Sequence, residues 1–411
     1  MDKGINPENQ HPDLFTPGKI GQLTLRNRTI RSAAFEGMCP GNKPSEDLLN
    51  YHQSVAAGGI GMTTIAYAAV HQSGLSFPHQ LWLKPEVITD LRRITDSIHK
   101  EGAAASIQIG HCGLMAKRSI AGGRPLAPSG GFNLYGPTFP RTMNEKNISE
   151  IIDSFGMAVH LAHESGFDAV EVHAGHGYLI SQFLSPYLNK RKDKWGGSFE
   201  NRTRFMSLVM KKVISSAKPG IAVLVKMNMR DAIAGGMEPD ESLEVAKMLE
   251  ELGADAIILS GGLVSRSPMY VMRGKMPVRI MGSKMKNPFM KFGVSLFGGL
   301  LMKQEPFSEM YFLEDAVKFR PVIKIPLVYV GGLVSGGNID TVMKQGFEFV
   351  SFARPLIHDP GFINKLKSGE IMKSGCNHSN YCIAVMYSGE MKCYQHENDL
   401  PAKWKNRLDK V

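Results

Sequence analysis

The chain has 411 residues, of which 43% are apolar and 21% charged. This composition excludes a disordered or fibrous protein and leaves enough apolar side chains for a large core. The formal net charge is +10, but residues 261–304 hold eight Lys or Arg and no acid, which leaves the other residues near +2. A charge confined to one segment argues against a general nucleic-acid surface.

The five cysteines are few, and no N-terminal segment has the charged-then-apolar pattern of a signal peptide. We therefore expect a reducing, cytoplasmic location. The uncharged apolar stretch 292–302 has eleven residues, whereas a spanning helix needs about 20. No transmembrane segment is expected, although the cations of 266–303 leave weak peripheral contact with anionic lipid open.

Short apolar or β-branched runs alternate along the chain with longer stretches of helical apolar spacing. The runs that predict strands are 29–34, 62–70, 104–110, 168–174, 222–228, 255–262, 326–332 and 347–353. The helices expected between them include 85–101, 149–165, 201–216, 240–252 and 338–345. Because nearly all-apolar strands must be covered on both faces, this succession predicts a parallel (β/α)8 TIM barrel. An open doubly wound sheet would need a G-x-G-x-x-G turn that is absent.

Three segments do not fit the repeat. Residues 14–28 alternate apolar and polar side chains around a glycine turn, which predicts an N-terminal hairpin that caps the barrel floor. Residues 263–320 are too long for one βα connection and predict an insertion after the sixth strand. We assign 1–370 to the barrel with its insertion, and 371–411 to a C-terminal tail that contains Cys376, Cys382 and Cys393.

Polar residues at the carboxyl ends of the strands are the first candidates for an active site in such a barrel. His173, His176 and Tyr178 follow the fourth predicted strand. Two imidazoles at one point can bind a metal or donate two hydrogen bonds to a developing oxyanion, and a phenol beside them can act as a general acid. A purely structural role for each of these residues remains the alternative.

The other strands carry two weaker signals. Gly331, Gly332 and Arg354 follow the seventh and eighth strands, where many such barrels bind a phosphate. Lys226 lies inside an apolar strand, where an unpaired ammonium is costly. It can contact an anionic cofactor or form a Schiff base, and the residues alone do not decide between these roles.

Residues 171–205 read EVHAGHGYLISQFLSPYLNKRKDKWGGSFENRTRF, and this stretch resembles the old yellow enzyme family of FMN-dependent ene-reductases and NADH:flavin oxidoreductases. The opening 14–28, the IQIGH around Gln108 and the GG and AR pairs near the end are similar to the family in order and spacing. The likeness covers about 14–370 and is greatest to the barrel domain of the 2,4-dienoyl-CoA reductase branch. It implies an FMN-containing (β/α)8 barrel, in agreement with the predicted fold.

The resemblance implies a role for each matching residue. His173 and His176 would bind the substrate carbonyl oxygen, and Tyr178 would be the proton donor. The implied FMN contacts are Ser32, Ala33, Ala34, Phe35, Tyr67, Gln108 and Lys226 for the ring, and Gly332, Ala353 and Arg354 for the phosphate. Lys226 stands where the family usually has an arginine, so the charge is kept but the fork geometry is lost. Because Ala33 and Ala34 stand in this part of the first strand, the chain lacks the Thr or Cys that the family usually has near flavin O4.

The tail resembles the Cys-rich stretch that holds a [4Fe-4S] cluster in the 2,4-dienoyl-CoA reductase branch. Ser379 replaces one cluster cysteine, and such clusters normally use four thiolates. We therefore expect a metal-free tail without a cluster. Zinc bound by the three cysteines with His378 or His396 is the alternative.

The implied reaction is hydride transfer from NAD(P)H through FMN to an electron-poor alkene, an enone or an enoyl thioester. The cationic insertion makes an acyl-CoA one candidate substrate, because a phosphate would suit its side chains, whereas a solvated lid without a ligand is the alternative. Two other functions remain open from the residues: a cofactor-free Schiff-base aldolase that uses Lys226, and a barrel kept as a non-catalytic binding module.

Overall fold

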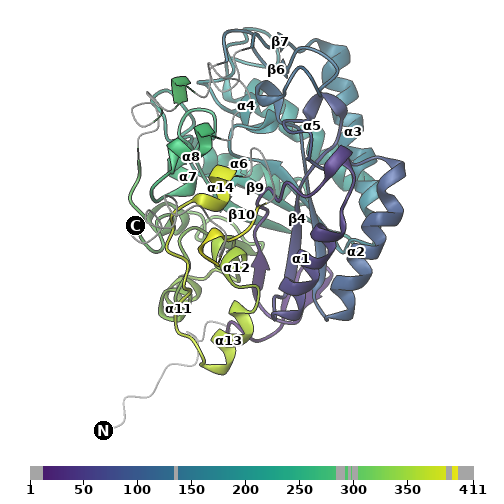
Figure 1. Ribbon diagram of the computed structural model, residues 1–411. Helices are drawn as coiled ribbons and strands as arrows, with labels where there is room; N and C mark the ends of the chain where they lie inside the picture. The colour runs from purple at the N-terminus through teal and green to yellow at the C-terminus, as the bar shows by residue number, and fades with distance from the viewer. Residues whose placement is uncertain are drawn as a thin grey trace.

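The computed structural model describes residues 13–133, 138–283, 292–294, 298, 304–385 and 391–396. Eight parallel strands form a closed barrel surrounded by helices (Figure 1). The barrel strands are β3 (Thr29–Arg31), β4 (Met62–Ala69), β5 (Ala104–Gly110), β8 (Ala169–Ala174), β9 (Ala222–Asn228), β10 (Ala256–Ser260), β11 (Leu327–Val330) and β12 (Phe349–Phe352). Each lies within one of the eight predicted runs, so the predicted TIM barrel is confirmed.

The helices cover the outer face of the barrel and follow the predicted stretches. The longer ones are α1 (Glu46–Ala57), α2 (Ile88–Lys100), α3 (Glu145–Glu164), α5 (Phe199–Ser216), α6 (Pro239–Glu251) and α11 (Gly336–Lys344). Helix α3 begins four residues before its predicted start. The side chain of Asn144 accepts a hydrogen bond from the Asn147 N–H, and the Asn147 side chain accepts one from the Asn144 N–H. This reciprocal cap starts the helix ahead of its first apolar residue.

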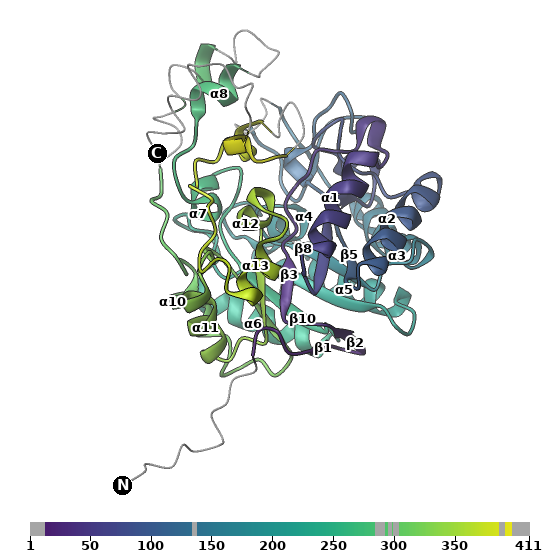
Figure 2. The ribbon, with the colours of Figure 1, turned by 60° about the horizontal axis from the view of Figure 1, so that its bottom comes forward.

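The predicted hairpin closes the amino-terminal end of the barrel. Strands β1 (Gly18–Ile20) and β2 (Leu23–Leu25) pair antiparallel, and Ile20 and Leu25 are buried against side chains from the barrel strands. At the turn, Gly21 has a φ of +55°, and a Cβ there would lie 2.3 Å from Asp255 Oδ1. Only glycine suits this position. The hairpin lies at the opposite end of the molecule from residues 278–283 of the insertion (Figure 2).

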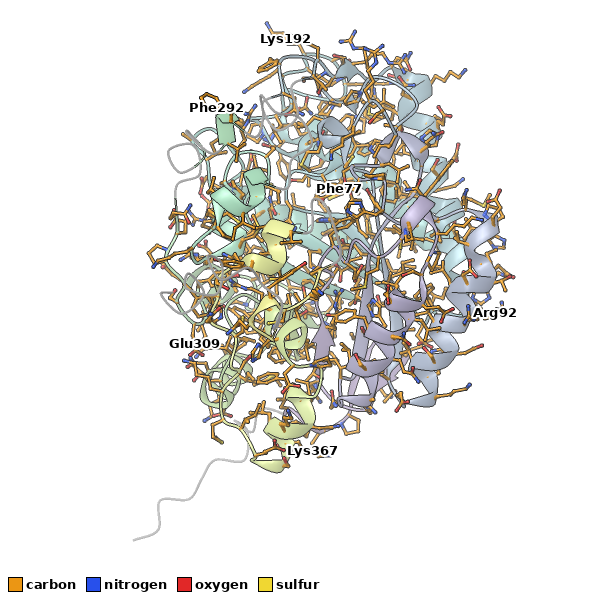
Figure 3. The ribbon with its side chains drawn as sticks, in the orientation of Figure 1. Phe77, Arg92, Lys192, Phe292, Glu309 and Lys367 are labelled. Carbon is orange, nitrogen blue, oxygen red and sulfur yellow. The ribbon has the colours of Figure 1, made fainter. Side chains whose placement is uncertain are left out.

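The described parts of the insertion and the tail pack on each other. The insertion contains α7 (Pro268–Met272) and α8 (Val278–Ser283), and the tail contains α14 (Tyr381–Val385). Met269, Met276 and Met281 form a buried apolar cluster with Ala384 of the tail. Phe292, whose side chain is largely exposed, lies at the outer edge of the insertion (Figure 3). The cations Lys284, Lys286, Lys291 and Lys303 lie outside the described residues.

Within the described ranges, no helix has both the length and the apolar content that a membrane crossing requires.

A buried arginine joins the first barrel strand to the loop that follows it. The Arg31 guanidinium is fully buried and donates hydrogen bonds to Thr64 O at 2.6 Å and Ala34 O at 3.1 Å. It also lies 2.7 Å from Glu36 Oε1, and both Glu36 carboxylate oxygens accept from the Ala66 N–H. This network fixes the backbone of residues 32–36 against β4.

Replacement of Arg31 by methionine should destabilise the fold strongly, because it leaves Glu36 as a buried carboxylate without its cation. We expect Arg31→Met to lower the free energy of unfolding by about 3 to 5 kcal/mol, measured by urea unfolding. The control is Arg93→Met, since Arg93 forms an exposed ion pair with Glu46 at 2.7 Å, and loss of such a pair costs about 1 kcal/mol or less. Equal losses in the two variants would contradict this account.

Candidate active site

Three neighbouring strands bring a buried polar group together inside the barrel. Lys226 Nζ on β9 lies 2.8 Å from Glu171 Oε1 on β8, and the same oxygen accepts a hydrogen bond from Gln108 Nε2 on β5 at 2.6 Å. Lys226 also donates to Ser32 Oγ at 3.4 Å. All four residues are 5% exposed or less. A buried ammonium is tolerated here because it is paired and hydrogen-bonded.

The two predicted histidines lie at the carboxyl end of β8. The chain turns sharply there, with φ of +59° at His176 and +76° at Gly177. Asn228 Oδ1 accepts a hydrogen bond from the His176 N–H at 2.8 Å, which stabilises the left-handed backbone of a residue other than glycine. The turn brings the His173 and His176 rings to a centroid distance of 5.1 Å. The two imidazoles therefore share one site.

Both imidazoles are held neutral. Burial, together with the nearby His176 and Lys226, lowers the pKa of His173 well below its usual value. Burial and the charge of Lys226 lower the pKa of His176 to about 3. A neutral imidazole keeps one N–H donor. The Gly175 N–H donates to His173 Nδ1 at 3.4 Å, which assigns the proton of His173 to Nε2.

Ser260 at the end of β10 contacts the second histidine. Its Oγ lies 2.7 Å from His176 Nε2. If the serine hydroxyl donates to Nε2, the proton of His176 is on Nδ1, so each histidine offers one N–H to a ligand.

Tyr178 lies directly before helix α4 (Leu179–Leu184) and packs on the first histidine, His173. Its ring stacks on His173 at a centroid distance of 4.3 Å and meets Tyr67 edge-on at 4.9 Å. Tyr67 Oη lies 2.7 Å from Ser76 Oγ, and burial, followed by the neighbouring Tyr178, raises the pKa of Tyr67 well above its usual value. Tyr67 therefore stays protonated beside the predicted proton donor.

The loop after β3 borders the same site. The Ser32 N–H donates to Phe352 O at 2.8 Å, and Ala34 O accepts from Arg31. Ala33 and Phe35 are half-buried and pack against the apolar cluster that includes Tyr67. The predicted contacts from this loop thus lie beside Tyr67 and Tyr178.

The predicted phosphate residues lie at the ends of two adjacent strands, β11 and β12. Gly332 has a φ of +71°, and a Cβ there would lie 2.7 Å from Ser308 O, so the backbone of the insertion needs glycine at this position. Arg354 opens helix α12 (Arg354–His358) behind Ala353. Its guanidinium donates to Arg273 O at 2.7 Å and Asn380 Oδ1 at 3.0 Å, so it also links the insertion to the tail.

These side chains fit a flavin. One cation, one amide and two neutral imidazole donors converge on the same end of the barrel as the loop 32–35. Glu171 Oε2 is buried and has no hydrogen-bond partner among the described residues. An unsatisfied acceptor of this kind suits a ligand with an N–H group, such as an isoalloxazine.

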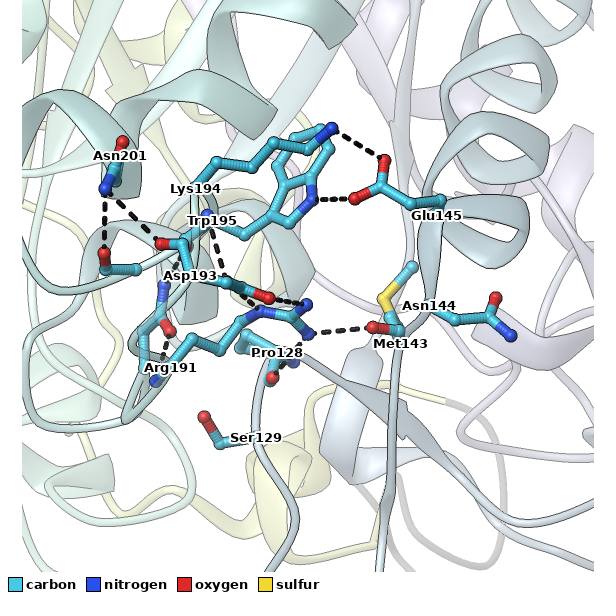
Figure 4. Close-up of polar contacts among 12 residues, drawn as sticks. Pro128, Ser129, Met143, Asn144, Glu145, Arg191, Asp193, Lys194, Trp195 and Asn201 are labelled. Carbon is cyan, nitrogen blue, oxygen red and sulfur yellow. Dashed lines mark hydrogen bonds and ion pairs between the residues drawn. The ribbon is translucent and has the colours of Figure 1, made fainter.

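Several residues of the long sequence motif, 171–205, hold neighbouring loops in place. The Arg191 guanidinium forms a forked ion pair with Asp193 and donates to Pro128 O and Met143 O (Figure 4). Trp195 Nε1 donates to Glu145 Oε1 at 2.7 Å, at the start of α3. These contacts fasten the loop after α4 to the short strands β6 (Leu126–Ala127) and β7 (Arg141–Thr142). The sequence motif therefore contains both residues of the site and residues that position the loop after α4.

Sequence reasoning left three residues of the site without a role: Glu171, Asn228 and Ser260. Glu171 and Asn228 stand out in the sequence as polar residues within apolar runs, but only the strand register pairs Glu171 with Gln108. Ser260 lies in a different run, 84 residues from His176. No local sequence pattern could have linked the two.

Three tail cysteines line one small cavity. It has a volume of about 20 Å³ and is bordered by Cys376, Cys382, Cys393, His358 and Arg354, among others. His358 Nδ1 lies 3.3 Å from Cys393 Sγ, whereas His378 stacks on Phe307 at a centroid distance of 3.4 Å. Among the residues placed by the structure, no group of three or more His, Cys, Asp or Glu is arranged to hold a metal. A tail without metal remains a prediction.

Comparison with known proteins identifies the class. Residues 13–295 match the NADH:flavin oxidoreductase / NADH oxidase family. The chain belongs to this family and is an oxidoreductase of the old yellow enzyme type. Membership implies a flavin and NAD(P)H as reactants, as the sequence motif indicated.

Two curated relatives are similar to most of this chain. The chain is 37% identical to the 4,4'-dithiodibutanoate disulfide reductase of Rhodococcus erythropolis, over 92% of this chain and 94% of that protein. It is 28% identical to the NADH oxidase of Thermoanaerobacter brockii, over 89% of this chain but 53% of that protein.

Solved structures share the fold. A 2-naphthoyl-CoA reductase complex matches 93% of this chain and 57% of its own, with a TM-score of 0.79 and 24% identity. The old yellow enzyme homologue from Zymomonas mobilis matches 95% and 99%, with a TM-score of 0.70 and 22% identity. At these identities the likeness supports the barrel and leaves the substrate open.

The lowered histidine pKa values predict a loss of stability in acid. In the unfolded chain a histidine has a pKa of about 6.5, so between that pH and about pH 3 the unfolded state binds a proton that folded His176 does not. The free energy of unfolding should therefore fall as the pH falls through this window. We expect His176→Asn to reduce the slope by up to about 1.4 kcal/mol per pH unit, measured by urea unfolding between pH 4 and 7.

The control for this measurement is His160→Asn, because His160 is exposed on α3. The pH slope of His176→Asn is compared with the slope of this exposed variant. An unaltered slope in His176→Asn would show that this imidazole is not held neutral.

Proposed function

We propose that the protein is an FMN-dependent ene-reductase that passes hydride from NAD(P)H to an electron-poor alkene, with Tyr178 as the proton donor. The observation that carries this proposal is the convergence of two neutral imidazoles and one phenol at the end of β8. An alkene conjugated to a carbonyl needs both functions: donors for the carbonyl oxygen, and an acid for the α-carbon.

The protein residues divide this work. His173 and His176 donate hydrogen bonds to the carbonyl oxygen, where negative charge develops, and removal of one such donor typically costs about 3 to 4 kcal/mol of barrier. Tyr178 gives its phenolic proton to the α-carbon. When bound, FMN supplies the hydride chemistry, uptake from NAD(P)H and delivery from N5 to the β-carbon. The residues that would hold it are Ser32, Ala33, Ala34, Phe35, Tyr67, Gln108, Lys226, Gly332, Ala353 and Arg354.

An organic disulfide is a second candidate substrate. It is favoured by the 37% identity to the Rhodococcus erythropolis protein named for reduction of 4,4'-dithiodibutanoate, since the match covers nearly all of both chains. The balanced reaction is RSSR + NAD(P)H + H⁺ → 2 RSH + NAD(P)⁺. A thiolate leaves without prior protonation, because thiols are fairly acidic, with a pKa of about 8.5 in free cysteine. This reaction therefore has less need of an acid than reduction of an alkene.

Two other proposals have less support. Family membership gives no support to a Schiff-base aldolase, and Lys226 is engaged by Glu171 at 2.8 Å. An acyl-CoA substrate remains a candidate: one structural neighbour is a complex of a reductase with 2-naphthoyl-CoA, and the insertion carries Arg266, Arg273 and Lys275.

Replacement of the phenol tests the proton donor. We expect Tyr178→Phe to slow alkene reduction by about 10²- to 10⁴-fold and to leave flavin reduction by NAD(P)H nearly unchanged. Stopped-flow absorbance of the two half-reactions, with cyclohexenone as the alkene, measures both effects. Equal losses in the two half-reactions would exclude Tyr178 as the donor, and a colourless purified protein would exclude the flavin itself.

The same variant separates the two candidate substrates. With 4,4'-dithiodibutanoate as oxidant, Tyr178→Phe should retain most of its turnover, because the departing thiolate needs no proton from the phenol. Parallel assays of alkene and disulfide on the unchanged protein and on Tyr178→Phe give this comparison. A disulfide rate that falls as steeply as the alkene rate would contradict this division of labour.

A further inference from the structure

Glu171 is a buried carboxylate in the middle of the proposed flavin site. Its Oε1 atom contacts Lys226 Nζ at 2.8 Å and accepts from Gln108 Nε2 at 2.6 Å. These contacts therefore engage the two side chains that would meet the pyrimidine edge of the flavin. Its Oε2 atom is buried without a hydrogen-bond partner in the described structure.

The pair of charges changes the electrostatics of the site. The side chains of Lys226 and Glu171 are 2% and 1% exposed, so water screens them little. His173 and His176 are neutral, since burial and the nearby lysine lower both of their pKa values. A lysine alone would present one full positive charge to a ligand at this end of the barrel. With Glu171 beside it, the pair sums to zero.

We propose that Glu171 is a positioning residue that sets the reduction potential of the bound flavin. This inference rests on the proposed function. Reduction adds two electrons and one proton to FMN, so the reduced ring carries a negative charge that a cation beside it stabilises. Glu171 cancels much of the stabilisation from Lys226 and holds the Gln108 amide in place. The flavin is thereby kept at a lower potential and gives up its hydride more readily.

Substitution by glutamine separates charge from shape. Glu171→Gln keeps the size of the side chain and an oxygen that can accept from Lys226 and Gln108, but removes the negative charge. We expect the ratio of reduced to oxidised flavin at a fixed ambient potential to rise at least tenfold, which is about 30 mV for a two-electron couple. Equilibration with a redox dye of known potential, followed by flavin absorbance, measures this ratio without turnover.

Two matched variants serve as controls. Glu171→Asp keeps the charge, so its potential should stay within the tenfold window of the unchanged protein. Glu200→Gln removes the same charge from a surface side chain that is 85% exposed, and it should leave the potential unchanged. If Glu171→Gln fails to fold with its lysine unpaired, Glu171→Gln/Lys226→Met removes both charges. Its potential should then also lie within the tenfold window.

The outcomes distinguish this inference from the proposed function. A higher flavin potential in the single variant Glu171→Gln supports a role for the carboxylate in setting the potential. An unchanged potential in the double variant supports it as well. An unchanged or lower potential in Glu171→Gln overturns it, as does a tenfold shift in the double variant. In those cases a yellow, NAD(P)H-reducible protein would leave the proposed function intact. A colourless unchanged protein would overturn both.

Discussion

The buried ion pair between Lys226 and Glu171 is the constraint on which the site depends. Each charge lies within an otherwise apolar strand, and neither could be buried there at low cost without the other. The pairing holds β8 and β9 in a register that places His173 opposite Lys226. The same contact thus stabilises the barrel interior and fixes Gln108, while burial, with Lys226 as a smaller cause, keeps the two imidazoles neutral. The same two side chains therefore contribute to the stability of the barrel and to the electrostatics of the site.

The sharp turn after β8 converts this register into a site. Strand residues alternate between the two faces of a sheet, so a straight continuation would not direct His173 and His176 to one point. The left-handed backbone at His176, held by Asn228 and followed by Gly177, brings the second ring back beside the first. Tyr178 then stacks on His173. Three functional groups therefore come from six consecutive residues.

Most of the barrel could be predicted from the sequence, because buried parallel strands are nearly all apolar and the helices between them have a clear period. Within the site, the sequence predicts residues that lie together on one strand or in one motif, such as His173, His176 and Tyr178. Ser260 and Glu171 gain their meaning from neighbours on other strands. Arg354 also contacts Arg273 of the insertion and Asn380 of the tail. These contacts depend on how the insertion packs on the tail, which local sequence patterns do not encode.

The packing of the insertion on the tail limits how these two segments can move. Methionines of α7 and α8 are buried against α14, and Arg354 at the end of the last barrel strand bonds both segments at once. Neither segment can shift without exposing sulfur-rich apolar surface and disturbing the guanidinium. A shift of the insertion relative to the tail would therefore disturb Arg354 directly, so the packing of these two segments and the start of α12 are coupled through one side chain.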